Sequence, residues 1–150
     1  MSVSFDDLEA AFVEAVKAHP AFVGWKKKGR RIFWRQVDQL HHGVELLRCK
    51  GSFEKVQLVG VCAFVSYVHP EKPLGYVPSE TWKDGRMFMR AYIVPERQMV
   101  DEPTFASGAV IAVRIPEDVK RWASTLSTDF SQVLVPWVQR AAGIRQSVQP

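Results

Sequence analysis

The last third of the chain carries the feature that most restricts its fold, an apolar stripe with the period of an α-helix. From Pro116 onward the apolar residues follow one another at steps of one, three or four: Val119, Trp122, Ala123, Leu126, Phe130, Val133, Leu134, Trp137, Val138 and Ala141. This spacing places them on one face of a helix, which is stable only when that face is buried. The rest of the chain must therefore supply a long apolar surface, and we expect Trp122 and Trp137 in the core.

Three residues predict where this helix begins, bends and ends. Pro116 suits the first helical position, and Glu117 and Asp118 follow it near the positive end of the helix dipole. Pro136 lies inside the pattern and predicts a kink, because proline has no N–H and clashes with the preceding turn. Gly143 is expected to end the helix.

A second helix is predicted near the N-terminus, over Ser4 to Ala18. Its apolar residues have helical spacing, and Ser4 is a suitable N-cap. His19 precedes Pro20 and is therefore disfavoured in helical conformation, so the helix should end there. The stripe consists of Phe5, Leu8, Phe12, Val13 and Val16.

Between the helices the sequence predicts strands separated by turns and loops. Residues 20–30 are expected to be a connection, and residues 69–85 and 95–107 to be loops. The segment 55–68 is apolar at almost every position, which is typical of a central strand covered on both faces. The five predicted strands are 31–37, 42–49, 55–68, 86–94 and 108–115.

This order of elements predicts an α+β fold. Strands in a run with helices at both ends favour an antiparallel sheet of about five strands, with the N-terminal helix and the long kinked C-terminal helix packed on one face. The 150 residues suit one domain, predicted over 1–144, with a flexible tail over 145–150.

Composition narrows the cellular context. No stretch is long and apolar enough for a transmembrane helix, and the acidic N-terminus does not resemble a signal peptide. We therefore expect a cytoplasmic protein with no membrane partner, in which Cys49 and Cys62 are reduced. The formal net charge of +4 permits contact with nucleic acid or with an acidic protein surface.

The strongest local motif is a basic segment, Lys26, Lys27, Lys28, Arg30 and Arg31, flanked by Trp25 and Trp34. Cations interleaved with aromatic residues suit nucleic acid, because cations neutralise phosphate and exposed rings stack on bases. The plain alternative is a solvated loop with both tryptophans in the core. If the first two strands form a tight hairpin, Arg35 and Arg48 could share a sheet face, and strand alternation places Arg86 and Arg90 on one face. Such a face could receive an anion or an acidic partner, or these could be ordinary solvent-side residues.

Motifs for catalysis or metal binding are absent from the sequence. It contains no Cys-x-x-Cys, His-Glu-x-x-His, Gly-x-Ser-x-Gly or phosphate-loop pattern. Glu45 lies in an apolar strand, where burial could raise its pKa, although such a residue more often faces solvent or pairs with arginine. We therefore expect no catalytic residues, no cofactor and no metal.

Several short patterns resemble one bacterial family. They are Phe22-x-x-Trp25-Lys26-x-x-Gly29, a strand with Trp34-Arg35, a hairpin through Val44-x-Leu46 and Leu58–Phe64, and a last helix with Leu134-Val135-Pro136-Trp137. Together they resemble the family called domain of unknown function 4304, which carries no established activity. Small α+β proteins of this kind often occur as accessory or immunity-type partners of secreted toxins.

Three functional hypotheses follow from the sequence. The first is a non-catalytic protein-binding module, an immunity-like, antitoxin-like or accessory protein, that meets an acidic partner through Trp25, Lys26, Lys27, Lys28, Arg30, Arg31 and Arg35. The second is a nucleic-acid-binding accessory protein that uses the same basic segment. The third is a small-ligand binder or enzyme with a pocket under the loop 69–85.

Overall fold

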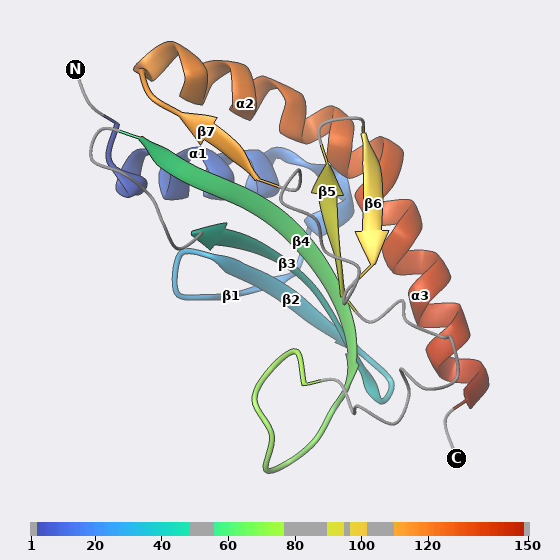
Figure 1. Cartoon of the computed structure of the whole chain (residues 1–150). Coiled ribbons are helices and arrows are strands. Elements are labelled where there is room, and N and C mark those ends of the chain that lie inside the picture. Colours follow the sequence, from blue (N-terminus) through green and yellow to red (C-terminus); the bar gives the residue numbers. More distant parts are fainter. Residues whose placement is uncertain (1–2, 49–55, 77–89, 95–96, 102–109, 149–150) are drawn as a thin grey trace.

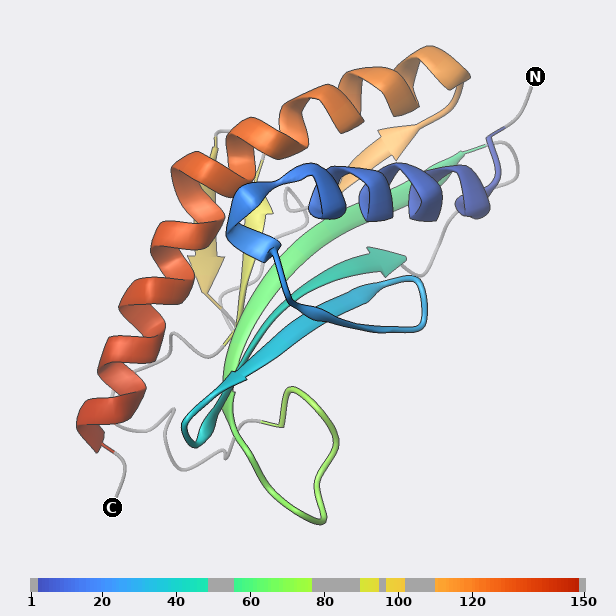
Figure 2. The same cartoon turned by 180° about the vertical axis from the view of Figure 1, so that it is seen from behind.

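An antiparallel sheet forms one layer of the structure, and helices cover one of its faces (Figures 1 and 2). The computed structural model describes residues 3–48, 56–76, 90–94, 97–101 and 110–148. The covering helices are α1 (Phe5–Ala18), α2 (Pro116–Asp129) and α3 (Val135–Val148). This arrangement confirms the predicted α+β fold with helices on one face.

The sheet has more strands than the sequence predicted. Its hydrogen-bonded path follows the order of the chain from β1 to β6, and β7 pairs with β4 off this path. The strands are β1 (Lys26–Lys28), β2 (Ile32–Val37), β3 (Leu40–Arg48), β4 (Gln57–Tyr67), β5 (Arg90–Val94), β6 (Gln98–Asp101) and β7 (Ile111–Val113).

The face of the sheet that the helices cover forms part of the main hydrophobic core. On the helix-covered face, the cross-strand row that contains Phe33, Val44, Ala63 and Ala91 joins the main core. The helices contribute the largest buried side chains of this core, among them Phe12, Phe130 and Trp137. β4 carries buried residues at nearly every position, as expected for a strand covered on both faces.

The predicted apolar stripe of the C-terminal helix is confirmed, because Trp122, Leu126, Phe130, Leu134 and Trp137 are all buried. Its interruption takes the form of a π-helical turn, η4 (Phe130–Leu134), between α2 and α3. The N–H of Val135 bonds to the carbonyl of Phe130, five residues earlier. The wide turn directly precedes Pro136, which has no N–H to continue the α-helical pattern, and the helix bends there in Figure 2.

The end of this helix corrects a prediction. Gly143 does not terminate it, because α3 continues to Val148. Glycine lowers helical stability by only about 1 kcal/mol relative to alanine, so a helix anchored by buried residues before it can pass through one. The tail predicted over 145–150 overlaps the end of α3, and its flexibility stays a prediction.

Two strands were predicted as irregular segments. Residues 26–28 form β1 because Gly29, with φ of +63°, allows the tight turn that pairs them with β2. Lysine has a low strand propensity, so the sequence alone did not predict this strand. Similarly, Arg97 adopts φ of +59° in the turn that pairs β6 with β5. The predicted strand residues 49, 55, 86–89 and 108–109 lie outside the described residues.

A close contact on the face away from the helices joins β3 to β4. The ring of Phe64 lies over Gly43, and a Cβ atom at Gly43 would overlap Cζ of Phe64. The two residues are directly opposite each other in the β3–β4 register. Glycine is therefore required at this position because an aromatic ring occupies the space of its side chain.

We predict that Gly43→Ala lowers the free energy of unfolding by about 1–3 kcal/mol, the usual cost of overpacking. The measurement is urea unfolding of both the single variant and the same change in a Phe64→Ala background. Without the ring, Gly43→Ala should be neutral or stabilising. An equal cost in both backgrounds would contradict the contact.

His42 is a buried titratable residue on the helix-covered face, only 4% exposed. Its Nδ1 accepts a hydrogen bond from Nε of Arg35 at 3.2 Å, which requires the neutral ring. Burial above all, and then the nearby charges of Arg35 and His41, lower the pKa of His42 from 6.5 to about 4. The folded state therefore binds this proton more weakly than the unfolded chain does.

We predict that the neutral His42 ring contributes up to about 3 kcal/mol to the free energy of unfolding above pH 6.5, and that this contribution is lost as the pH falls toward 4. Chemical unfolding between pH 7 and pH 4 measures this slope. The variant His42→Gln should lose that part of the slope, whereas His69→Gln, at an exposed site, should keep it. If His42→Gln keeps the same pH dependence of unfolding free energy as the parent protein, that dependence comes from other groups.

Candidate functional site

The two edges of β4 are paired differently. Along one edge β3 pairs with it from Val59 to Tyr67 without interruption, so Gly60, where the sequence suggested a bulge or a close approach, causes no bulge there. The other edge is shared, since β7 pairs with residues 57–59 and β5 with residues 62–64. Neither pairing includes Gly60 or Val61, so the described part of the sheet has a gap at these residues.

The hydrogen bonds between β3 and β4 show which backbone groups face this gap. Val68 donates its N–H to the carbonyl oxygen of Gln39 at 2.9 Å, so even-numbered residues of β4 face β3. The direction alternates along a strand. The N–H and C=O of Val61 therefore face the shared edge, between the residues that pair with β7 and those that pair with β5.

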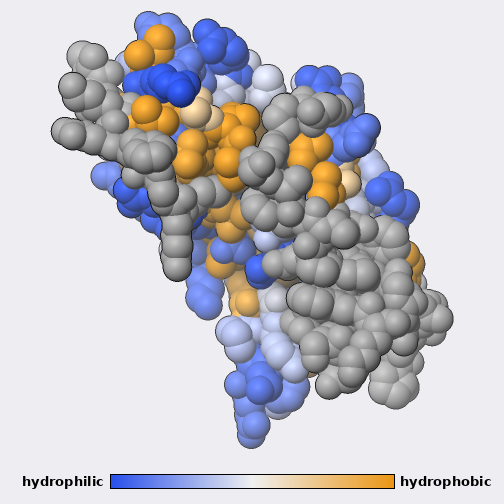
Figure 3. Space-filling model, viewed as in Figure 1, coloured by the Kyte–Doolittle hydropathy of each residue, from blue (hydrophilic) through white to orange (hydrophobic). Residues whose placement is uncertain are grey.

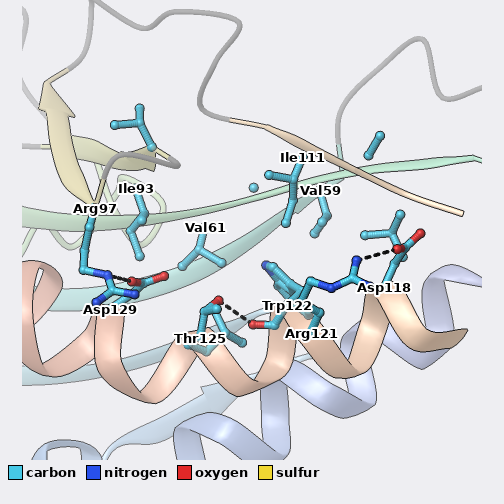
Figure 4. Close-up of a pocket in the computed structure, with 15 residues that line it drawn as sticks. Val59, Val61, Ile93, Arg97, Ile111, Asp118, Arg121, Trp122, Thr125 and Asp129 are labelled. Carbon is cyan, nitrogen blue, oxygen red and sulfur yellow. Dashed lines mark hydrogen bonds and ion pairs between the residues drawn. The ribbon is translucent and has the colours of Figure 1, made fainter. Parts of the chain in front are cut away.

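A pocket of about 350 Å³ lies at the gap, between β4 and α2 (Figure 4). We call it the edge pocket. Its walls are largely apolar, with side chains from strands on one side and from α2 on the other: Val59, Val61, Ile93, Ile111, Trp122 and Leu126. Figure 3 shows hydrophobic residues at the surface in the upper half of the view, in the region of β7 and in that of β5 and β6.

Charged residues lie at the two ends of the edge pocket, and each is paired (Figure 4). At one end, Nε of Arg97 is 3.0 Å from a carboxylate oxygen of Asp129. At the other end, Nη1 of Arg121 is 3.0 Å from a carboxylate oxygen of Asp118. The formal charges of these four residues sum to zero, and an ionic ligand would have to compete with an existing ion pair.

The pKa values of the two pocket carboxylates shift in opposite directions. The pKa of Asp118 is lowered, because its carboxylate accepts hydrogen bonds from the backbone N–H groups of Arg114 and Ile115 at the start of α2. Burial raises the pKa of Asp129, and the charge of Arg97 opposes that shift. Arg97 also donates to Oε1 of Gln132 at 3.3 Å, so one side chain ties the β5–β6 turn to the C-terminal helix.

The structure divides the basic segment that the sequence singled out. Lys26, Lys27 and Lys28 are exposed on β1, the outermost strand of the sheet path. Arg30 and Arg31 instead turn to α1, where Glu9 lies 3.8 Å from Arg30 and 3.0 Å from Arg31. Of the five cations in this segment, only the three lysines form no salt bridge with a described residue.

The side chains of Trp25 and Arg35 pack against each other. The guanidinium of Arg35 stacks over the Trp25 ring at 5.3 Å, and Phe22 packs edge-on against the same ring at 4.8 Å. Arg35 and Arg48 share the helix-covered face, as predicted, because even separations along β3 keep side chains on one side.

Glu45 lies on the opposite face, as a half-buried acid near cations. Burial raises its pKa, while the charges of Arg90, Arg31 and Lys28 lower it. The carboxylate oxygen is 4.0 Å from the buried Sγ of Cys62, directly across the β3–β4 pair. The sequence left two alternatives for Glu45, a pKa raised by burial or a neighbouring arginine, and the structure shows both influences at this residue.

Among the described residues, no group of three or more histidine, cysteine, aspartate or glutamate side chains is arranged to hold a metal ion. None of the described helices is both long enough and apolar enough to cross a bilayer. The pocket predicted under residues 69–85 falls largely outside the described residues, which end at Tyr76 in that segment.

Comparison with protein-family models, with curated proteins and with solved structures finds no match. The resemblance to the domain of unknown function 4304 family, and the immunity-type role that it suggests, therefore stay predictions.

The sequence did not indicate the edge pocket. One signal was present, because Asp118, Arg121, Thr125 and Asp129 recur at helical spacing beside the apolar stripe of α2. The other half of the pocket depends on where β5, β6 and β7 lie against β4. Arg97 in particular was assigned to a loop, and nothing local places it beside Asp129.

Proposed function

We propose that the protein binds a small, mainly apolar molecule without net charge in the edge pocket. The observation that carries this proposal is the apolar pocket beside α2, next to Gly60 and Val61 of β4, which pair with neither β5 nor β7 within the described residues. Its volume of about 350 Å³ falls in the range of small-molecule sites, roughly 300–1,000 Å³.

The lining supports a ligand that is apolar over most of its surface. Burying apolar area contributes about 25 cal/mol for each Å² removed from water, so valine, isoleucine and tryptophan walls favour a hydrocarbon or aromatic body. A single hydrogen-bonding group on such a ligand has partners at the gap. The N–H of Val61 would meet a carbonyl, or its C=O would meet an amide or amine.

The paired charges support a ligand without net charge. A carboxylate placed against Arg97 would have to displace Asp129, and one placed against Arg121 would have to displace Asp118. Asp129 is partly buried, so an anion that took its arginine would leave this carboxylate without its partner, and the new pair would have to offset that loss. A neutral ligand leaves both pairs intact.

The first test uses 1-aminoanthracene, a neutral fluorescent probe, with Thr125→Phe and a matched control. Thr125 lines the pocket, and its hydroxyl bonds to the carbonyl of Trp122; exposed Ser124 makes the equivalent bond to the carbonyl of Arg121. We expect Thr125→Phe to fill the pocket and weaken probe binding at least about tenfold. Ser124→Phe should bind as the parent protein does.

Equal probe affinity in parent and Thr125→Phe, with both proteins folded by circular dichroism, would contradict the proposal. Equal weakening by Ser124→Phe would contradict it too, because it would show that the loss does not depend on the pocket.

A second prediction concerns charge selectivity. Asp129→Asn removes the carboxylate that pairs with Arg97, so the pocket gains one unpaired cation. We expect this variant to bind 1-anthracenecarboxylate, an anionic analogue of the neutral probe, about tenfold more tightly than the parent does. Its affinity for 1-aminoanthracene should change little. If the anion gains nothing, the charges at the pocket end do not set selectivity.

A further inference from the structure

A second surface, distant in sequence from the edge pocket, lies along β1. An open groove of about 640 Å³ runs between β1 and the second half of α1. Ala10, Val13 and Ala18 give it an apolar floor, while Lys17, Lys27 and Arg30 add cations and Glu14 adds one acid. The groove therefore combines apolar contact area with an excess of positive charge.

β1 borders this groove with an edge available for strand pairing. It pairs with β2 on one side and ends the sheet path, so on its other side no described strand follows. By register Lys27 lies opposite Phe33, on the helix-covered face that includes the groove. Lys26 and Lys28 lie on the other face. The backbone groups of an edge strand are a template for an added strand.

The lysines determine which strand could be added. Lysine at a sheet edge normally prevents pairing with another apolar edge, because its charge would be buried there. A strand that carries acids opposite Lys26 and Lys28 removes that cost, since directly opposite charges attract across an antiparallel pair. Alternate residues of the same strand would face the groove, where the floor is apolar.

The aromatic residues of the segment favour a protein over a nucleic acid. Nζ of Lys26 lies over the Trp34 ring at 5.0 Å, and His41 packs edge-on against that ring at 5.3 Å. Trp25 is likewise stacked by Arg35. Base stacking needs a free ring face beside the cations. Both rings already have cations or aromatic side chains against them.

We propose that β1 and the groove beside it bind an extended segment of a partner protein, in which acidic residues alternate with small apolar residues. The segment adds to the sheet as a strand next to β1. Its acids pair with Lys26 and Lys28, and its apolar side chains contact Ala10, Val13 and Ala18. This mode of recognition takes affinity from backbone hydrogen bonds and specificity from alternate side chains.

The test measures binding of a fluorescent octapeptide that alternates glutamate and valine. Two protein variants with equal charge change are compared, Lys26→Glu/Lys28→Glu and the control Lys72→Glu/Lys120→Glu, whose lysines are exposed elsewhere. We expect the β1 variant to lose at least about tenfold in affinity and the control to stay within about twofold. Thermal melting confirms that both variants fold.

Two further probes separate this mode from simple charge attraction. The same peptide with N-methyl groups on alternate residues keeps its charge but loses half of its N–H donors, and it should not bind. A single-stranded oligonucleotide should bind more weakly than the unmodified peptide. Equal binding of the N-methylated peptide, equal losses in both protein variants, or tighter binding of the oligonucleotide would each overturn the proposal.

Discussion

The structure depends on how the eleven residues of β4 are paired. β3 pairs with one edge from Val59 to Tyr67, but the other edge is divided between β5 and β7, and within the described residues neither of them pairs with Val61. α2 covers the sheet at this point, so the interruption becomes a pocket with apolar walls.

The long C-terminal helix connects the stability of the fold to this site. Its stripe supplies Trp122 and Leu126 to both the core and the pocket wall. The polar flank of the same helix supplies Asp118 and Asp129, which hold the two arginines at the pocket ends. The π-helical turn begins directly after Asp129, so the bend of the helix follows the residue that anchors the β5–β6 turn.

The sequence predicted what local patterns encode. The two helices were predictable from the helical period of their apolar residues, and the central strand from its continuous apolar run, because burial imposes both patterns directly. The sequence did not predict β1, because lysine has a low strand propensity. It did not predict the edge pocket either, because the pocket depends on pairings between strands that are distant in sequence. The basic segment was recognised as unusual, but its division into three exposed lysines and two arginines bound by Glu9 required α1 to be placed.

The backbone amide of Val61 gives the most direct test of the account. The measurement is titration of ¹⁵N-labelled protein with 1-aminoanthracene, followed by amide chemical shifts. If the edge pocket binds the probe, the amides of Val61 and neighbouring Thr125 shift most and their shifts saturate together, while those of Lys26 to Lys28 stay unchanged. Saturable shifts centred elsewhere, with Val61 unaffected, would contradict the claim that the gap in β4 pairing is a ligand site.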